Sequence, residues 1–347
     1  MVFDSIIPSL HNQTTSLHPT SHIGIILSAL GTPDKPTYHA VRRYLSEFLS
    51  DRRTIETHPL IWQPLLQGVI LLTHPITSSK AYRRIWNNTK NESPLRLITR
   101  KQAEYLTERM APSGVNVTFG MRYGTPSLKE AIYSLIRQGC QRILCMPLYP
   151  QYSATSTATT NDQIFRILMQ LRHQPAIRTL PSFADHPHFI TALAYNIRTA
   201  QAKADYPFER IIASFHGLPQ TYVDKGDPYP NECLRTVQAL RSALDIDEIV
   251  MPITYQSRFG RASWLTPYTA PFIQALPAQG IKHIAVITPG FMADCLETLD
   301  EIGHEIHHLF LKAGGKSFTL IPCLNTSTTS IDLLETLARN ELSGWLT

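Results

Sequence analysis

The stretch LSALGTP at residues 27–33 ends an apolar run with a glycine and a proline, and ASFHGLP at residues 213–219 repeats that pattern in the second half of the chain. An apolar run closed by such a turn is typical of a buried strand and its carboxyl end. If the two stretches are equivalent, Leu30 and His216 occupy matching positions in two similar halves. Ligands of open α/β sheets bind outside the carboxyl ends of the strands, so both side chains are predicted to face one cleft. The alternative, that any two strand–turn–helix units look alike, stays open at this point.

The rest of the chain alternates short apolar runs with longer segments of helical period. This alternation predicts an α/β fold of two Rossmann-like lobes, each a parallel sheet flanked by helices, with a cleft between them. Strands are expected at residues 23–29, 115–119, 143–146, 177–180, 210–215, 249–254, 284–288 and 318–321. Helices are expected at residues 38–49, 95–110, 128–138, 162–171, 188–203, 233–243, 268–276, 297–312 and about 330–342.

The length of 347 residues exceeds what one small core organises and favours two domains. A polar lead-in rich in Ser, Thr and His is expected to be mobile over residues 1–20. The first lobe is expected at residues 21–160, with the C-terminal helix of about 330–347 packing back on it. The second lobe is expected at residues 161–329 and carries the candidate metal-site residues.

Composition and charge disfavour several functional classes. The 32 Lys and Arg against 27 Asp and Glu give a net charge of +5, without a basic block that tracks a phosphate backbone, so no nucleic acid partner is expected. No GxGxxG or complete phosphate-binding loop follows a predicted strand, which disfavours a nucleotide-dependent enzyme. The first basic residue is Lys35, so a secretory signal or transit peptide is disfavoured. Five scattered cysteines without a CxxC motif indicate reduced thiols in a cytoplasmic protein.

An uncharged apolar stripe, LIWQPLLQGVI, occupies residues 60–70. The longest uncharged stretch, residues 57–79, is interrupted by prolines, so no transmembrane helix is predicted. The stripe fits plain core packing, a lip for a large planar ligand, or a peripheral membrane contact.

A row of acids follows one of the last predicted strands. Asp294, Glu297, Asp300, Glu301 and Glu305 come without a Lys or Arg among them. The three glutamates recur every four residues and share one helix face, although like charges at that spacing destabilise a helix. The row is therefore predicted to hold a cation or a proton, with an unrelated solvated acidic face as the alternative. The four-residue repeat suits a slightly widened, π-type helix.

Two further groups carry possible chemistry. His216 directly follows a predicted strand, and neutral imidazole binds a divalent metal or accepts a proton near neutral pH, unless the side chain is structural. Arg122, Tyr123, Tyr149 and Tyr152 stand at strand ends of the first half. A guanidinium group suits a carboxylate, and phenols suit the edge of a flat ring, but a tyrosine cluster at the edge of the core fits as well.

Several long motifs together resemble the ferrochelatase family. They are LGTP at 30–33, FLSDRR at 48–53, PLYPQYSAT at 147–155, SFHGLP at 214–219, YVDKGDPYPNE at 222–232, TYQSRFGRASWLTPYT at 254–269 and PGFMADCLETLDE at 289–301. They run in order over nearly the whole chain, from about residue 22 to residue 325. The resemblance implies chelatase-type lobes and an enzyme of haem biosynthesis, a lyase that inserts Fe²⁺ into protoporphyrin IX and releases two protons.

The resemblance also implies roles for individual residues. His216 and Glu297 match the catalytic, metal-binding pair, and Glu301, Glu305 and Asp294 match an acidic relay behind it. The porphyrin-binding positions are Leu30, Arg122, Tyr123, Tyr149, Ser153 and Trp264. Iron is then a substrate and no cofactor is required. Because no cysteine follows Cys323, no iron–sulfur cluster is expected.

The residues leave alternatives open. An aliphatic Leu30 favours protoporphyrin over coproporphyrin III, whereas Ala29 departs from the asparagine that is usual in the family. Another tetrapyrrole metal chelatase, or a tetrapyrrole or metal carrier without enzymatic activity, also fits the two-lobed pattern.

Overall fold

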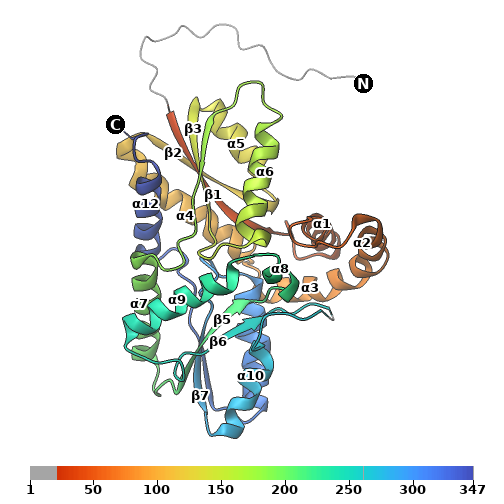
Figure 1. Ribbon diagram of the computed structural model, residues 1–347, viewed down its shortest axis with the longest axis vertical. Coiled ribbons are helices and arrows are strands. Elements are labelled where there is room, and N and C mark those ends of the chain that lie inside the picture. The colour runs from red at the N-terminus through yellow and green to blue at the C-terminus, as the bar shows by residue number, and fades with distance from the viewer. Residues whose placement is uncertain (1–21, 261, 347) are drawn as a thin grey trace.

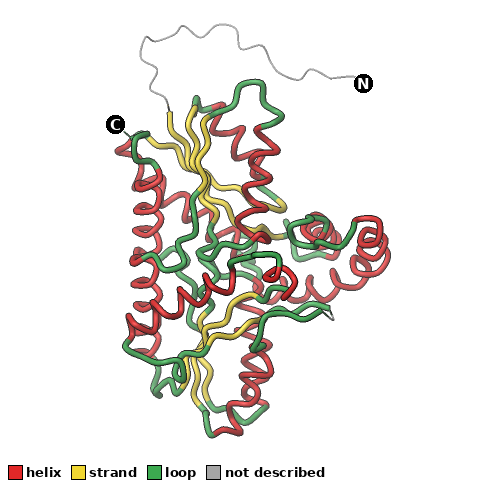
Figure 2. The backbone as a smooth tube through the Cα atoms, in the orientation of Figure 1, coloured by secondary structure: helices red, strands yellow, loops and turns green. Residues whose placement is uncertain are grey.

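Parallel strands form two four-stranded sheets in the computed structural model, which describes residues 22–260 and 262–346. The predicted lead-in at residues 1–20 lies outside the described residues. The strands of the first sheet are β1 (His22–Thr32), β2 (Val115–Gly124), β3 (Cys140–Pro147) and β4 (Ala176–Thr179). Those of the second are β5 (Arg210–His216), β6 (Ile253–Gln256), β7 (His283–Ile287) and β8 (Ser317–Leu320). Figure 2 shows the two sheets in yellow, one above the other, with helices along both.

The two sheets have the same topology. The first has the order β2-β1-β3-β4 and the second β6-β5-β7-β8, so β5 takes the place of β1. This correspondence confirms the predicted two-lobed α/β fold and the equivalence of residues 27–33 and 213–219. The proposed lobe boundaries stay predictions.

The helices of the first half cover both faces of its sheet and extend from it. They are α1 (Tyr38–Leu49), α2 (Pro59–Leu65), the π-helix η1 (Leu66–Ile70), α3 (Leu71–Ile85), α4 (Pro94–Met110), η2 (Ala111–Ser113), α5 (Leu128–Arg137), the π-helix η3 (Ala154–Ala158) and α6 (Thr159–Leu168). Figure 1 shows α1, α2 and α3 projecting to one side of the molecule, level with the region between the sheets.

The helices of the second half include a long π-helical segment. They are α7 (Pro187–Lys203), α8 (Gln220–Asp224), α9 (Tyr229–Leu244), α10 (Thr269–Ala275), η4 (Leu276–Gln279), the π-helix η5 (Glu297–Ile306), α11 (His307–Lys312) and α12 (Thr328–Glu341). The widened helix predicted from the four-residue acidic repeat is confirmed by η5. The C-terminal helix α12 packs against α4 of the first half and also against α7.

Three clusters of buried side chains hold these layers together. The largest runs through both sheets and includes Leu27 and Phe215 with residues of α4, α7, α9 and α12. A second cluster around Ile26 packs α5 and α6 on the opposite face of the first sheet. A third, around Phe310, packs α10, η5 and α11 on the second sheet. Because both faces are covered, the central strands are almost continuously apolar, as in β1.

Two predictions about the elements are wrong. The strand expected at 249–254 begins only at Ile253, because Asp247 accepts a hydrogen bond from the Val250 amide at 2.9 Å and turns the chain. The helical segment from α2 to α3 is missing from the expected helices. Pro64 and Pro75 argue against a helix there, yet Pro64 lies on the exposed face of α2 and Pro75 is buried inside α3.

Candidate functional site

A cavity of about 390 Å³ lies where the carboxyl ends of the two sheets face each other. Leu30 of β1 and Tyr149 after β3 line it from the first lobe, and His216 and Glu297 line it from the second. The cleft predicted from the two matching turns is thus present, with Leu30 and His216 both in its wall. Among the described residues, no lysine or arginine lines this cavity.

His216 is the last residue of β5, and one of its ring nitrogens is hydrogen-bonded to the backbone. Its Nδ1 lies 2.7 Å from the carbonyl oxygen of Gly217, and because a carbonyl only accepts, Nδ1 donates this bond. The neutral ring therefore carries its lone pair on Nε2. Metal-binding and proton-accepting histidines are oriented in this way by a bond at the other nitrogen.

The turn after His216 requires a glycine and seats an indole ring. A Cβ on Gly217 would approach the Gln256 carbonyl oxygen to 2.8 Å and the Trp264 ring to 3.0 Å. Trp264 lines the cavity, and within residues 22–260 and 262–346 its buried Nε1 finds no hydrogen-bond partner. The side chain therefore supplies a flat apolar surface beside His216.

Glu297 is the first residue of η5 and is fixed to the neighbouring strand. The Gln256 side chain at the end of β6 donates to the Glu297 backbone carbonyl at 2.9 Å. In the parallel register of β5 and β6, Gln256 pairs with His216. One residue therefore links the strand of His216 to the helix of Glu297, and both functional side chains reach the same cavity.

Glu301 lies behind Glu297 and is held by the same strand end. Its carboxylate accepts hydrogen bonds from the Ser257 amide at 2.7 Å and from Gln256 Nε2 at 3.2 Å. Ser257 has a positive φ of 62°, which turns its amide toward the carboxylate. Burial raises the pKa of Glu301 above its usual value, so this carboxyl group is disposed to hold a proton.

The outer acids differ in their surroundings. The Glu305 side chain is 62% exposed and lies 3.8 Å from Arg84 of α3. Asp294, predicted as part of the relay, does not line the cavity. Its carboxylate instead accepts bonds from Asn325 Nδ2 at 2.6 Å and from the Thr298 hydroxyl at 3.0 Å. Asp294 therefore fixes the loop after β8 to the start of η5, and its part in the relay stays a prediction.

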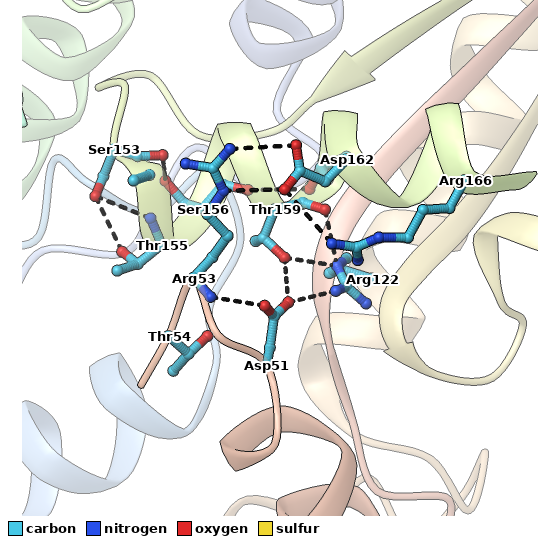
Figure 3. A network of polar contacts seen from close by, with 12 residues as sticks. Asp51, Arg53, Thr54, Arg122, Ser153, Thr155, Ser156, Thr159, Asp162 and Arg166 are labelled. Atoms are coloured by element: carbon cyan, nitrogen blue, oxygen red, sulfur yellow. Dashed lines mark hydrogen bonds and ion pairs between the residues drawn. The ribbon is translucent and has the colours of Figure 1, made fainter. Parts of the chain in front are cut away.

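Arg122 and Tyr123, predicted to bind porphyrin, lie behind the cavity wall and do not line it. The Arg122 guanidinium is ion-paired with Asp51 and donates from Nε to the Thr159 hydroxyl at 2.8 Å. The Tyr123 hydroxyl donates to Asp51 at 2.8 Å, and burial raises the pKa of this phenol to about 12. Figure 3 shows Asp51 with Arg122 and Thr159, close to Thr54, which does line the cavity. The two residues shape the wall from outside, and their predicted contact with porphyrin stays a prediction.

Ser153 lines the cavity, as predicted, and also joins the two halves. Its hydroxyl donates to Asp227 at 2.9 Å, and the Ala154 amide donates to the same oxygen at 2.8 Å. Asp227 belongs to the loop between α8 and α9. The hydroxyl is therefore oriented by a residue of the opposite lobe.

Sequence reasoning missed two phenols beside Glu297. Tyr44 of α1 and Tyr82 of α3 both line the cavity and are buried. Burial raises the pKa of both phenols well above the usual value, and the charge of Glu297 adds to it. Tyr82 could have been found only by recognising α3 as a helix, and Pro75 inside that segment argues against one.

The described part of the chain lacks two features, a clustered metal site and a membrane-spanning helix. Within residues 22–260 and 262–346, no cluster of three or more His, Cys, Asp or Glu side chains could hold a metal ion. Within the same ranges, no helix combines the length and the apolar character that crossing a membrane requires.

Comparisons of the sequence point to one family. A sequence model described as ferrochelatase matches residues 22–342. The ferrochelatase of Gluconobacter oxydans is 58% identical over 327 residues, covering 94% of this chain and 95% of that protein. The ferrochelatase of Brucella anthropi is 49% identical over 340 residues, covering 98% and 97%.

Comparisons of the structure show the same architecture in distant proteins. SirB from Bacillus subtilis with Fe³⁺ has a TM-score of 0.53 at 12% identity, over 71% of this chain and 91% of that chain. The sirohydrochlorin chelatase SirB from Bacillus subtilis subspecies spizizenii with cobalt has a TM-score of 0.52 at 8% identity, over 93% and 96%. At such identities the likeness concerns the fold alone, and it agrees with two Rossmann-like lobes.

Proposed function

The chain belongs to the ferrochelatase family, and we propose that it inserts Fe²⁺ into protoporphyrin IX bound in the cavity between its lobes, releasing two protons and forming protohaem. Ferrochelatases are metal chelatases of haem biosynthesis, and both the ion and the porphyrin are substrates. The observation that carries the proposal is the convergence of His216 and Glu297 on one cavity that no lysine or arginine lines within the described ranges.

The lining of the cavity supports protoporphyrin IX as the porphyrin. Leu30, Phe48, Ile55 and Met292 give the wall an apolar character. Protoporphyrin carries two propionates and two vinyl groups, whereas coproporphyrin III carries four propionates. A cavity whose wall supplies no lysine or arginine from residues 22–260 and 262–346 favours the macrocycle with fewer carboxylates, because an unpaired buried charge is costly.

His216 is proposed to take a pyrrole proton. Its Nδ1 already donates to Gly217, so the free Nε2 can accept one proton and form an imidazolium ion. We propose that the macrocycle lies between Leu30 and the imidazole, which both line the cavity, and that bulk water is excluded around it. A macrocycle bent between these walls exposes its pyrrole nitrogen lone pairs, and such distortion contributes up to about 5 kcal/mol.

The carboxylates of η5 are proposed to guide the metal ion. Glu297 lines the cavity, Glu301 lies behind it, and Glu305 is exposed to solvent. Carboxylate oxygens accept Fe²⁺, and such a small set of ligands releases the ion readily to the four porphyrin nitrogens, while His216 Nε2 takes the proton. Iron enters as the bare ion, two protons leave, and the charges balance.

A turnover assay tests the proposal. Purified protein is mixed anaerobically with protoporphyrin IX and Fe²⁺, and the absorbance bands are followed while substrate exceeds enzyme. Many turnovers are expected, and His216→Ala should lower kcat by about 10² or more while porphyrin still binds. Conversion of a single equivalent, or none, would instead indicate a carrier.

The exposed apolar side chains of α2 and α3 support a peripheral membrane contact. Leu60, Ile61 and Leu72 are 81%, 68% and 53% exposed on the projecting segment. The inner face of α3 supplies His74 and Tyr82 to the cavity wall. We call the segment from α2 to α3 the lip of the cavity. We infer that the lip touches a bilayer surface and lets an apolar porphyrin pass directly into the cavity.

Location and cofactor requirement are also proposals. All five cysteines are free and buried, which suits a reducing compartment such as the cytoplasm. Burial raises the pKa of the Cys233, Cys295 and Cys323 thiols well above the usual value, whereas cluster ligands must be thiolates. We therefore propose that the reaction uses no iron–sulfur cluster.

A further inference from the structure

Two exposed histidines lie one turn apart where η5 continues into α11, and the proposed reaction does not use them. The ring centroids of His304 and His308 are 4.4 Å apart and the rings are inclined at 66°. Side chains four residues apart are neighbours on a helix surface, and two such histidines form a known type of metal-binding pair.

The orientation of His308 is already that of a metal ligand. Its Nδ1 donates to the His304 carbonyl oxygen at 2.6 Å, so the neutral ring carries its lone pair on Nε2. Histidines that bind metals usually hold the other nitrogen in such a bond to a backbone carbonyl. His307 does not take part, because its ring stacks on Phe318 with centroids 4.9 Å apart.

The pair stands at the solvent end of the acidic row. Along η5, Glu297 lines the cavity, Glu301 is mostly enclosed, and the Glu305 side chain is 62% exposed. His304 precedes Glu305 directly and His308 follows it by three residues, and both are exposed. An ion that reaches the row from solvent therefore meets the imidazoles first.

We propose that His304 and His308 together bind a divalent first-row transition-metal ion and capture it before it passes along the glutamates to Glu297. This inference rests on the proposed function, because it assumes that the metal enters along η5. Imidazole nitrogen accepts Fe²⁺, Co²⁺ and Zn²⁺. With two protein ligands and water completing the shell, the site stays open, as a site that passes its metal on requires.

Metal binding is tested with Zn²⁺ alone on the full chain by equilibrium dialysis. Wild type is expected to bind one more equivalent of Zn²⁺ than the double variant H304A/H308A. The matched control H39A/H173A also removes two exposed histidines, from α1 and from the segment between α6 and β4, and should bind as wild type does. Equal stoichiometry in wild type and H304A/H308A would overturn the proposal.

Capture is tested by anaerobic insertion of Fe²⁺ into protoporphyrin IX. In H304A/H308A the KM for iron should rise about fivefold while kcat falls less than twofold, because the pair binds the ion away from the reacting nitrogens. An unchanged KM despite the lost zinc equivalent would also overturn the proposal. If wild type binds the additional equivalent but turns over no porphyrin, the proposed function fails, and with it the capture role, while the two-imidazole site stands.

Discussion

Arg84 of α3 binds the carboxylate of Asp300 on η5 through two hydrogen bonds, from Nε at 2.5 Å and from Nη2 at 2.7 Å. The Asp300 side chain is only 5% exposed, and the two residues are 216 positions apart. The cation that the acidic segment lacks in its own sequence is thus supplied by the opposite half. The pair holds the helix of Glu297 against the helix that forms the lip of the cavity.

Replacing Arg84 should destabilise the fold more than breaking a surface ion pair does. Arg84→Ala leaves the carboxylate of Asp300 buried without its partner, which should lower the free energy of unfolding by about 2 kcal/mol in urea titrations. The control Arg109→Ala breaks ion pairs to Asp332 and Glu335 on the surface and should cost less than about 1 kcal/mol. If both variants lost the same unfolding free energy, the Arg84–Asp300 pair would not be what holds η5 in place.

Arg122 should matter for stability and not for direct porphyrin contact. Burial by itself would raise the pKa of Asp51, but hydrogen bonds from Thr159 and Tyr123 and the charge of Arg122 lower it below the usual value. Arg122→Ala removes the cation that pairs with this carboxylate and should lower the free energy of unfolding by about 3 kcal/mol. As a control, Arg53→Ala breaks the ion pair to Asp162. Because the Arg53 side chain is 45% exposed, the free energy of unfolding should fall by less than about 1 kcal/mol. If Arg122→Ala were as stable as wild type but bound porphyrin more weakly, Arg122 would contact the porphyrin directly.

Arg122 also shows where prediction from sequence stops. The matching turns predicted that Leu30 and His216 share a cleft, and the four-residue repeat predicted a widened acidic helix, because both depend on local pattern. The partner of Arg122 is 71 residues away and that of Arg84 is 216 residues away. Such pairings depend on how the layers pack, and no local pattern encodes them.

Glu301 should make stability depend on pH in a defined direction. Burial raises its pKa in the folded state above the usual 4.5, so the folded protein binds more protons here than the unfolded chain. The unfolding free energy contributed by Glu301 therefore falls as pH rises from about 4.5 through the raised pKa.

The comparison with Glu301→Gln isolates this effect. The stability of wild type relative to Glu301→Gln should increase as the pH of urea titrations is lowered from 8 to about 5. Glu108→Gln, at an exposed position of α4, should track wild type at every pH. A difference that is flat, or that grows toward high pH, would contradict the assignment.

The lip should bind membranes through its exposed aliphatic side chains. The double variant Leu60→Asp with Ile61→Asp should reduce co-sedimentation with phosphatidylglycerol-containing vesicles by about tenfold. The variant loses two apolar side chains that the bilayer would bury, which costs at least about 1.4 kcal/mol of binding free energy. The matched control Phe165→Asp with Met169→Asp alters side chains that are 48% and 80% exposed, on α6 and directly after it. Equal loss in both pairs would remove the lip from membrane contact.

The central claim is that one porphyrin ring lies between the lobes with His216 and Glu297 directed at its centre. A crystal structure of the full chain with protoporphyrin IX tests this most directly. The account predicts the macrocycle in the cavity between Leu30 and His216, with His216 Nε2 and the Glu297 carboxylate nearest the pyrrole nitrogens. A macrocycle bound elsewhere, for instance against the arginine-rich surface of Arg42, Arg43 and Arg52, would contradict it.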